Sequence, residues 1–168
     1  MRTRATAIKR LDLRINELAV KQRWLERLSA MLADAQVLGN GRWDVRRMRY
    51  EVDLERICYE TGIAGELTHE YPSIACRLSI NPVLSFVDGR DGVEESWSGE
   101  TLVGLELRDP HELALVSTYG TTRLRLGPGA TLEVRDTGTP NDHHLVCDHG
   151  QPPLELRSAH ELMRLRVV

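Results

Sequence analysis

The chain has 168 residues, of which 41% are hydrophobic and 28% charged, a balance typical of a soluble globular domain. Aromatic residues make up only 5%, so we expect aliphatic side chains to build the core. Its apolar runs are far shorter than the roughly 20 residues of a bilayer-spanning helix, and charges interrupt its start, so we expect a protein that is neither membrane-spanning nor secreted. Three widely spaced cysteines without a CxxC pair argue against a disulfide framework and favour a cytoplasmic or virion setting.

The net charge of −3 hides an asymmetry along the chain. Residues 1–50 carry 12 basic and 5 acidic side chains, a net charge of +7. Residues 51–168 carry 10 basic and 20 acidic side chains, a net charge of −10. Opposite charges on two parts of one chain predict association, in which the basic segment contacts the body of another copy or an acidic neighbour.

The first predicted element is one long helix over residues 5–37, which contain neither glycine nor proline. Apolar residues recur at the heptad spacing of a coiled coil, and a second apolar stripe begins halfway along, so two faces need packing partners. At 1.5 Å per residue such a helix would reach about 50 Å, more than the radius of a compact domain of this size. We therefore expect residues 1–41 to form a projecting helical stalk that serves oligomerisation; the alternative is a single helix that lies across a sheet.

The candidate contact residues lie on this predicted stalk. The residues expected at the interface are the heptad stripe and one tryptophan: Ile8, Leu11, Ile15, Leu18, Trp24, Leu25 and Leu32. The residues expected to make electrostatic contacts are basic and precede or begin the helix: Arg2, Arg4, Lys9, Arg10 and Arg14. Arginine at this density also suits contacts with nucleic-acid phosphates, so a nucleic-acid-associated regulator is an alternative.

After residue 41 the hydrophobic period changes from that of a helix to that of a strand. Residues 48–54 alternate between apolar and charged side chains, which predicts a strand with one solvated face. Eight further strand-like stretches follow, at residues 74–80, 83–87, 101–108, 113–119, 122–126, 131–135, 144–147 and 162–168. They are separated mainly by turn signals such as Asp-Gly, Asp-Pro and Gly-Pro-Gly. We expect residues 42–168 to form an all-β domain, an antiparallel sandwich or barrel, and the predicted fold class is α+β.

The densest group of candidate metal ligands follows residue 142. It consists of His143, His144, Cys147 and His149, and imidazole and thiolate are ligands that suit zinc. The competing interpretation is a turn between strands in which the histidines are exposed and the cysteine is buried. We predict no cofactor, with zinc at this cluster as the alternative.

Motifs that would identify a reaction are missing from the sequence. There is no P-loop and no GxGxxG, GxSxG or HExxH pattern, which favours a non-enzymatic role. We predict a structural or assembly protein that self-associates through its N-terminal helix within a multi-subunit complex, such as a virion, tail or adaptor component. A metal-dependent β-barrel enzyme built on the His/Cys cluster is a further alternative. The expected partners are other copies of the chain or acidic proteins, with nucleic acid as an alternative and no membrane.

Overall fold

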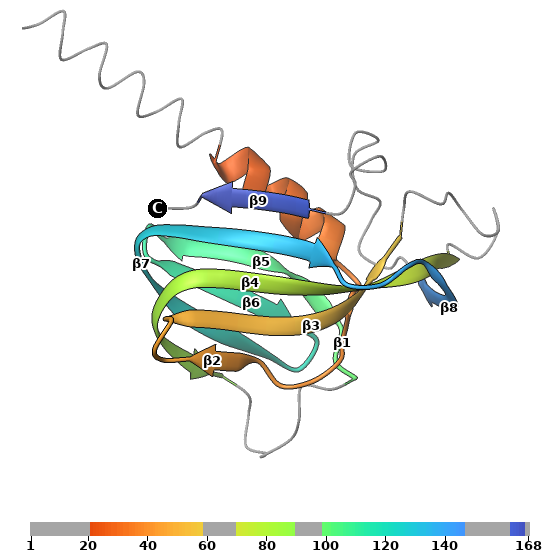
Figure 1. Cartoon of the computed structure of the whole chain (residues 1–168), viewed down its shortest axis with the longest axis horizontal. Helices are drawn as coiled ribbons and strands as arrows, with labels where there is room; N and C mark the ends of the chain where they lie inside the picture. Colours follow the sequence, from red (N-terminus) through yellow and green to blue (C-terminus); the bar gives the residue numbers. More distant parts are fainter. Residues whose placement is uncertain (1–20, 59–69, 90–98, 147–161, 167–168) are drawn as a thin grey trace, which may run out of the picture.

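The computed structural model describes residues 21–58, 70–89, 99–146 and 162–166 (Figure 1). Strands account for 67% of these residues, and a short helix at residues 21–32 accounts for 11%. The predicted fold class is therefore wrong, because the described chain is mostly antiparallel β and its helix ends at residue 32 instead of continuing to residue 37. Residues 1–20, on which the rest of the predicted helix falls, lie outside the described residues.

Strand pairing ends the helix. The Asp34 amide donates to the carbonyl of Leu102, 2.9 Å away, and not to the preceding helical turn. Asp34 also takes a left-handed conformation, with φ of 65°, which a continuous helix does not allow. Two residues later the chain enters a strand. Tertiary hydrogen bonds thus override the helical propensity of residues 33–37.

The described residues form nine strands in one antiparallel sheet. They are β1 (Gln36–Val37), β2 (Arg42–Asp44), β3 (Arg49–Ile57), β4 (Glu70–Asp88), β5 (Leu102–Asp109), β6 (Glu112–Ser117), β7 (Gly120–Asp136), β8 (Asn141–Val146) and β9 (Leu162–Arg166). The main order is β1-β3-β4-β7-β6-β5, and β2, β8 and β9 are added beside β3, β4 and β7 respectively.

The sheet curls into a half-barrel, so that β5 and β6 lie behind β3 and β4 in Figure 1. The two strands at the ends of the main order are β1 and β5, and backbone hydrogen bonds join the segment that contains β1 to the start of β5. The Val37 amide donates to the carbonyl of Glu100 at 2.7 Å, and the Leu102 amide donates to the carbonyl of Ala35 at 2.8 Å. These bonds satisfy backbone groups that an open sheet edge would leave exposed.

The inside of the curl is packed with aliphatic side chains from the helix and the sheet. The helix contributes Leu25, Leu28, Met31 and Leu32, which share one hydrophobic core with the strands. The Ser29 hydroxyl accepts a hydrogen bond from the Leu105 amide at 2.8 Å, which ties the helix to β5. Residues 25–37 thus pack on the strands of the β region, while the division of the chain at residue 41 stays a prediction.

A buried ion pair joins β3 to β7 across β4. The Arg56 guanidinium is 3% exposed and meets the Asp136 carboxylate at 2.9 and 2.8 Å through two nitrogens. A third nitrogen of Arg56 donates to the carbonyl of Ile57 at 3.0 Å. Cys76 lies opposite Asp136 in the strand register, and burial raises the pKa of its thiol to about 12. This paired interior charge fixes the lateral order of three strands.

β4 carries a break that separates two differently paired halves. Its residues 76–80 lie between β3 and β7, whereas its residues from Val83 onward pair with β7 alone among the described strands. Register shifts occur on both sides of Val83, next to Pro82, which has no amide hydrogen to donate to a ladder. The strand therefore continues past the start of β3, and its last residues lie at a margin of the sheet.

Within the described residues no helix has the length and hydropathy needed to cross a bilayer.

Candidate interaction surface

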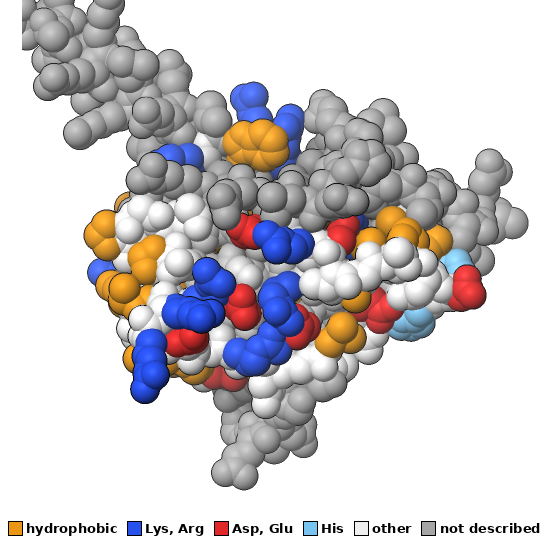
Figure 2. Space-filling model, viewed as in Figure 1, with side chains coloured by type: hydrophobic (Ala, Val, Ile, Leu, Met, Phe, Trp, Pro, Cys, Tyr) orange, Lys and Arg blue, Asp and Glu red, His pale blue; other side chains and the backbone are white. Residues whose placement is uncertain are grey.

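Exposed hydrophobic side chains gather where the turn between β2 and β3 meets the end of β4. We call this the apolar end surface and define it by five residues: Val45, Met48, Leu84, Phe86 and Val87. Their exposed fractions range from 39% for Phe86 to 63% for Val45, so each keeps a large apolar area in water. Figure 2 shows hydrophobic side chains at the left of the view, on the side where β4 curls. Clustered apolar area of this kind marks interaction sites.

The turn that carries Val45 and Met48 is held rigidly by backbone contacts. One carboxylate oxygen of Asp44 accepts hydrogen bonds from the amides of Arg46 and Arg47, at 3.0 and 3.2 Å. The Met48 carbonyl accepts from the Val83 amide at 2.6 Å, which ties the turn to β4. An Asx turn followed by a strand contact leaves few backbone conformations to the segment that carries these apolar side chains.

Aromatic contacts fix the other half of the surface. The Phe86 ring lies 5.6 Å from the Trp43 ring, nearly edge to face, and 5.6 Å from the Tyr50 ring. The Trp43 indole nitrogen donates to the carbonyl of Val83 at 3.2 Å. Phe86 is opposite Leu124 in the strand register, so one side of the ring meets the core and the other stays exposed. The ring is thus positioned before any partner binds.

Arginines lie on two sides of the apolar end surface, where Asp44 and Asp88 are also exposed. Arg46 lies between its turn residues, and Arg123 lies opposite Val87 on β7. Both are exposed, and no ion pair with a described residue neutralises either guanidinium. Arg47 has only a loose ion pair with Asp44, at 3.7 Å. The surface therefore combines apolar side chains with positive charge that has no partner in the described chain.

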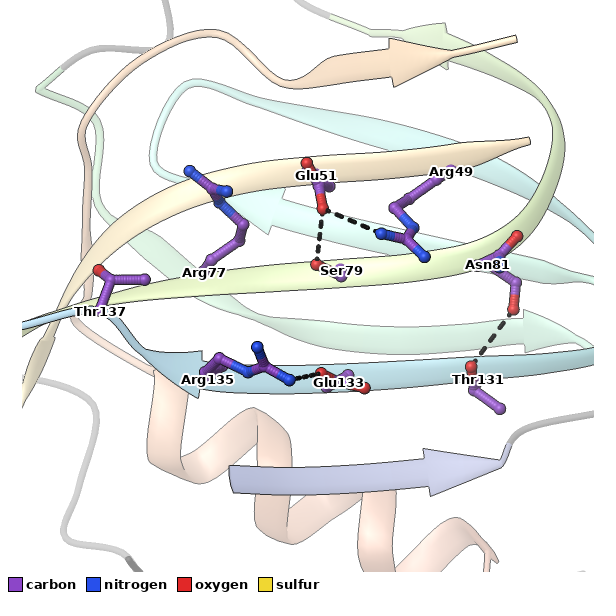
Figure 3. Close-up of a pocket in the computed structure, with 9 residues that line it drawn as sticks. All are labelled: Arg49, Glu51, Arg77, Ser79, Asn81, Thr131, Glu133, Arg135 and Thr137. Atoms are coloured by element: carbon purple, nitrogen blue, oxygen red, sulfur yellow. Dashed lines mark hydrogen bonds and ion pairs between the residues drawn. The ribbon is translucent and has the colours of Figure 1, made fainter. Parts of the chain in front are cut away.

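A second surface, the polar face, covers the outside of β3, β4 and β7. A groove of about 510 Å³ runs across it, and its lining residues are drawn in Figure 3: Arg49, Glu51, Arg77, Ser79, Asn81, Thr131, Glu133, Arg135 and Thr137. Both signs of charge alternate over the centre of Figure 2. They come from the outward-facing positions of strands whose other positions are buried.

The charges of the polar face neutralise one another. Arg77 contacts the Asp53 carboxylate at 2.7 Å and Arg135 contacts Glu133 at 3.2 Å, while Arg49 and Glu51 are 3.8 Å apart. The hydrogen bond from Arg77 lowers the pKa of Asp53, to which Arg42 also contributes, and the same bond raises the pKa of Arg77. A ligand of this groove would have to break pairs that already exist.

A third polar cluster joins β8 to the sheet through Glu55. Its carboxylate accepts a hydrogen bond from Asn141 at 3.1 Å and meets the His143 ring at 3.0 Å. Burial raises the pKa of Glu55, but hydrogen bonds from Ser73, Asn141 and His143 together outweigh burial and lower it. The cluster is a structural connection between β3, β4 and β8.

The predicted metal ligands are dispersed or lie outside the described residues. His143 contacts Glu55, and His144 is opposite Pro72 in the register of β4 and β8. Cys147 and His149 lie outside the described residues. Among the side chains that the structure describes, no group of three or more histidines, cysteines, aspartates or glutamates is placed to hold a metal ion.

The predicted stalk contacts are placed only in part. Leu25 and Leu32 are buried against the sheet of their own chain, so they do not form an exposed stripe. Trp24 is 43% exposed, and the Arg27 guanidinium lies 5.3 Å from its ring centre. The other predicted contacts lie outside the described residues: Ile8, Leu11, Ile15, Leu18, Arg2, Arg4, Lys9, Arg10 and Arg14.

The apolar end surface was missed because the sequence predicted residues 83–87 as an ordinary strand. Two signals could have found it. Residues 82–87 are apolar at five of six positions, in contrast to the alternation of residues 48–54. Pro82 in addition indicates a sheet edge, since it cannot donate a ladder hydrogen bond.

Comparison of the chain with protein-family models, curated proteins and solved structures finds no match to any of them.

Proposed function

We propose that this protein is a non-enzymatic assembly component that binds another protein through its apolar end surface. The observation that carries the proposal is the coincidence of five exposed apolar side chains, on a backbone held by hydrogen bonds, with arginines that lack ion-pair partners in the described chain. Aromatic residues, methionine and arginine are the residue types enriched at protein interfaces.

Rigid display supports binding in energetic terms. Association costs free energy for every side chain and loop that must be ordered, and preformed surfaces avoid most of that cost. Phe86 is already packed on Trp43, and the turn before Met48 is already held by Asp44. A partner that covers this surface would gain apolar burial at about 25 cal/mol per Å² with little ordering cost.

The polar face is the weaker candidate because its charges are satisfied within the chain. Arg77 and Arg135 each contact a carboxylate within 3.2 Å. Arg46 and Arg123 have no such contact in the described residues, so a partner carboxylate there gains an interaction without breaking one. Self-association through Ile8, Leu11, Ile15 and Leu18 stays a separate prediction.

The test compares two surface substitutions with a matched control. Met48→Asp and Val87→Asp place a charge in the apolar end surface, and Val146→Asp places one on β8, where Val146 is also exposed.

Each tagged full-length chain is cross-linked in the cells that produce it, isolated and analysed by sedimentation. We expect the wild type and Val146→Asp to sediment with another protein chain, and amide exchange to slow in residues 43–48 and 84–88. The two end-surface variants should sediment as the free chain. Sedimentation of these variants that equals the wild type would overturn the proposal.

A further inference from the structure

We infer that the partner binds as an extended segment that adds a strand to the open edge of β4, and that this segment is acidic with interspersed apolar side chains. The inference rests on the proposed function and specifies how the apolar end surface is used.

Among the residues that the structure describes, one edge of β4 has no strand partner at the apolar end surface. β3 pairs with β4 from Ser73 to Ile80 and no further. From Val83 to Asp88, the strand neighbour that the described chain provides is β7 alone. The edge away from β7 is covered at Val83, whose amide donates to Met48 and whose carbonyl accepts from Trp43. Within the described residues no strand continues this cover over 84–87.

Pro82 and the register shifts around Val83 protect the start of this edge, whereas residues 84–87 carry no protecting charge. Natural edges carry lysine, proline or inward-pointing charges, or are covered by another element. Residues 84–87 read Leu-Ser-Phe-Val, are all exposed and contain no charge. At the opposite end of the same strand, β8 pairs with β4 and protects it. An exposed apolar edge is a template for strand addition.

The arginines near residues 84–87 indicate the charge of the segment that would bind there. Arg123 stands beside Val87, and Arg46 projects from the turn on the other side of the surface. A segment lying along residues 84–87 would therefore pass between positive groups, which favours aspartate or glutamate in it. Alternate side chains of an added strand point to opposite faces, so apolar residues between the acidic ones would meet Leu84 and Phe86. A second copy of β4 would instead bring these arginines toward their own counterparts, which costs free energy.

The experiment titrates the isotope-labelled full-length chain with a synthetic peptide of about ten residues in which valine and glutamate alternate. A second peptide carries lysine in place of glutamate. Two further peptides are N-methylated, one on every valine amide and the other on every glutamate amide. Alternate amides of a strand point to the same edge, so only one of these two methylations blocks pairing with β4.

We expect amide chemical-shift changes concentrated in residues 84–88 and 43–48. The lysine peptide and one of the methylated peptides should bind at least about tenfold more weakly than the parent, and the other methylated peptide should bind like it. Arg123→Gln should weaken binding of the glutamate peptide without changing its site, and Arg135→Gln on the polar face is the matched control.

Several outcomes would overturn the inference. Equal binding of both methylated peptides and the parent would show docking by side chains alone, and the proposed function would survive. Equal binding of the lysine peptide would contradict an acidic partner. Absence of binding up to about 1 mM would contradict strand addition. Phosphatidylserine vesicles or duplex DNA could change the amide chemical shifts of the same residues when the peptide does not bind. That result would identify a membrane or a nucleic acid as the partner in place of the acidic segment. Dimerisation through this edge would identify a second copy of the chain as the partner.

Discussion

The polar face and the apolar end surface use the same strands in opposite ways. Over residues 76–80, β4 lies between two neighbours, and its outward residues Arg77 and Ser79 bond to carboxylates of β3. Beyond Pro82 it has one described neighbour, and its residues Leu84 and Val87 are exposed. Charges are paired where the sheet is complete, and apolar groups are exposed where it is incomplete. The candidate site is therefore located by a strand that has one neighbour in the described chain, and not by a concentration of reactive groups.

The largest expected effect comes from breaking the deepest charge pair. Asp136→Ala leaves Arg56 buried without its carboxylate, and we expect a loss of about 3–5 kcal/mol in the free energy of unfolding, measured by urea denaturation. Glu133→Ala, which removes the partner of Arg135 at the surface, is the control and should cost less than about 1 kcal/mol. Similar losses for both variants would contradict the distinction between buried and exposed pairs.

The next effect concerns strain at the apolar end surface. Met48 has a φ of 51°, a left-handed conformation that costs a residue with a Cβ about 1–2 kcal/mol. Glycine is free of this cost, although its unfolded state is more flexible, so Met48→Gly should raise stability by up to about 1 kcal/mol. It should at the same time weaken partner binding. Met48→Ala keeps the Cβ and should give no gain in the same thermal or urea measurement.

A smaller effect is expected from pH. The pKa values of Asp53 and Glu55 are lowered in the folded protein, so both carboxylates stabilise it above their ordinary pKa values. The loss of this contribution begins as the pH falls below about 4.5, near the ordinary pKa of these carboxyl groups. It is complete once the pH is below their lowered pKa values in the folded protein. Asp53→Asn and Glu55→Gln should each remove about 0.5–1 kcal/mol at pH 7 and flatten the decline between pH 5 and 3. A decline as steep in the variants as in the wild type would exclude these two carboxylates as its source.

Substitutions of exposed valines on the apolar end surface should change the free energy of unfolding least and partner binding most. Val45→Ser and Val87→Thr remove exposed apolar groups, so the urea midpoint should correspond to a change within about 0.5 kcal/mol. Binding of an apolar dye that fluoresces on exposed hydrophobic surface should fall. Loss of stability beyond 1 kcal/mol would mean that these side chains serve packing, not recognition.

Strand content and much of the burial pattern could be predicted from the sequence, because alternation is local. The alternation of residues 48–54 predicts the strand that appears as β3, with its even-numbered apolar positions buried. The low aromatic content predicts the aliphatic core. The end of the helix could not be predicted, since Asp34 and Val37 bond to residues more than 60 positions away. Residues 122–126 and 131–135 were predicted as two strands separated by a Gly-Pro-Gly turn, whereas β7 runs through both, because each half pairs with a different half of β4.

Residue types and local patterns were enough to predict many strands, an aliphatic interior, one solvated face for the strand of residues 48–54 and an excess of positive charge before residue 50. These properties depend on residue type and on a period of two, which are readable within a few positions. Tertiary contacts set where the helix ends, which charges pair, and that residues 84–87, beside Met48 and Arg123, have β7 as their one strand neighbour in the described chain. Each of these depends on strand pairing and sheet curvature between distant segments, and no local pattern encodes which neighbour a strand will lack.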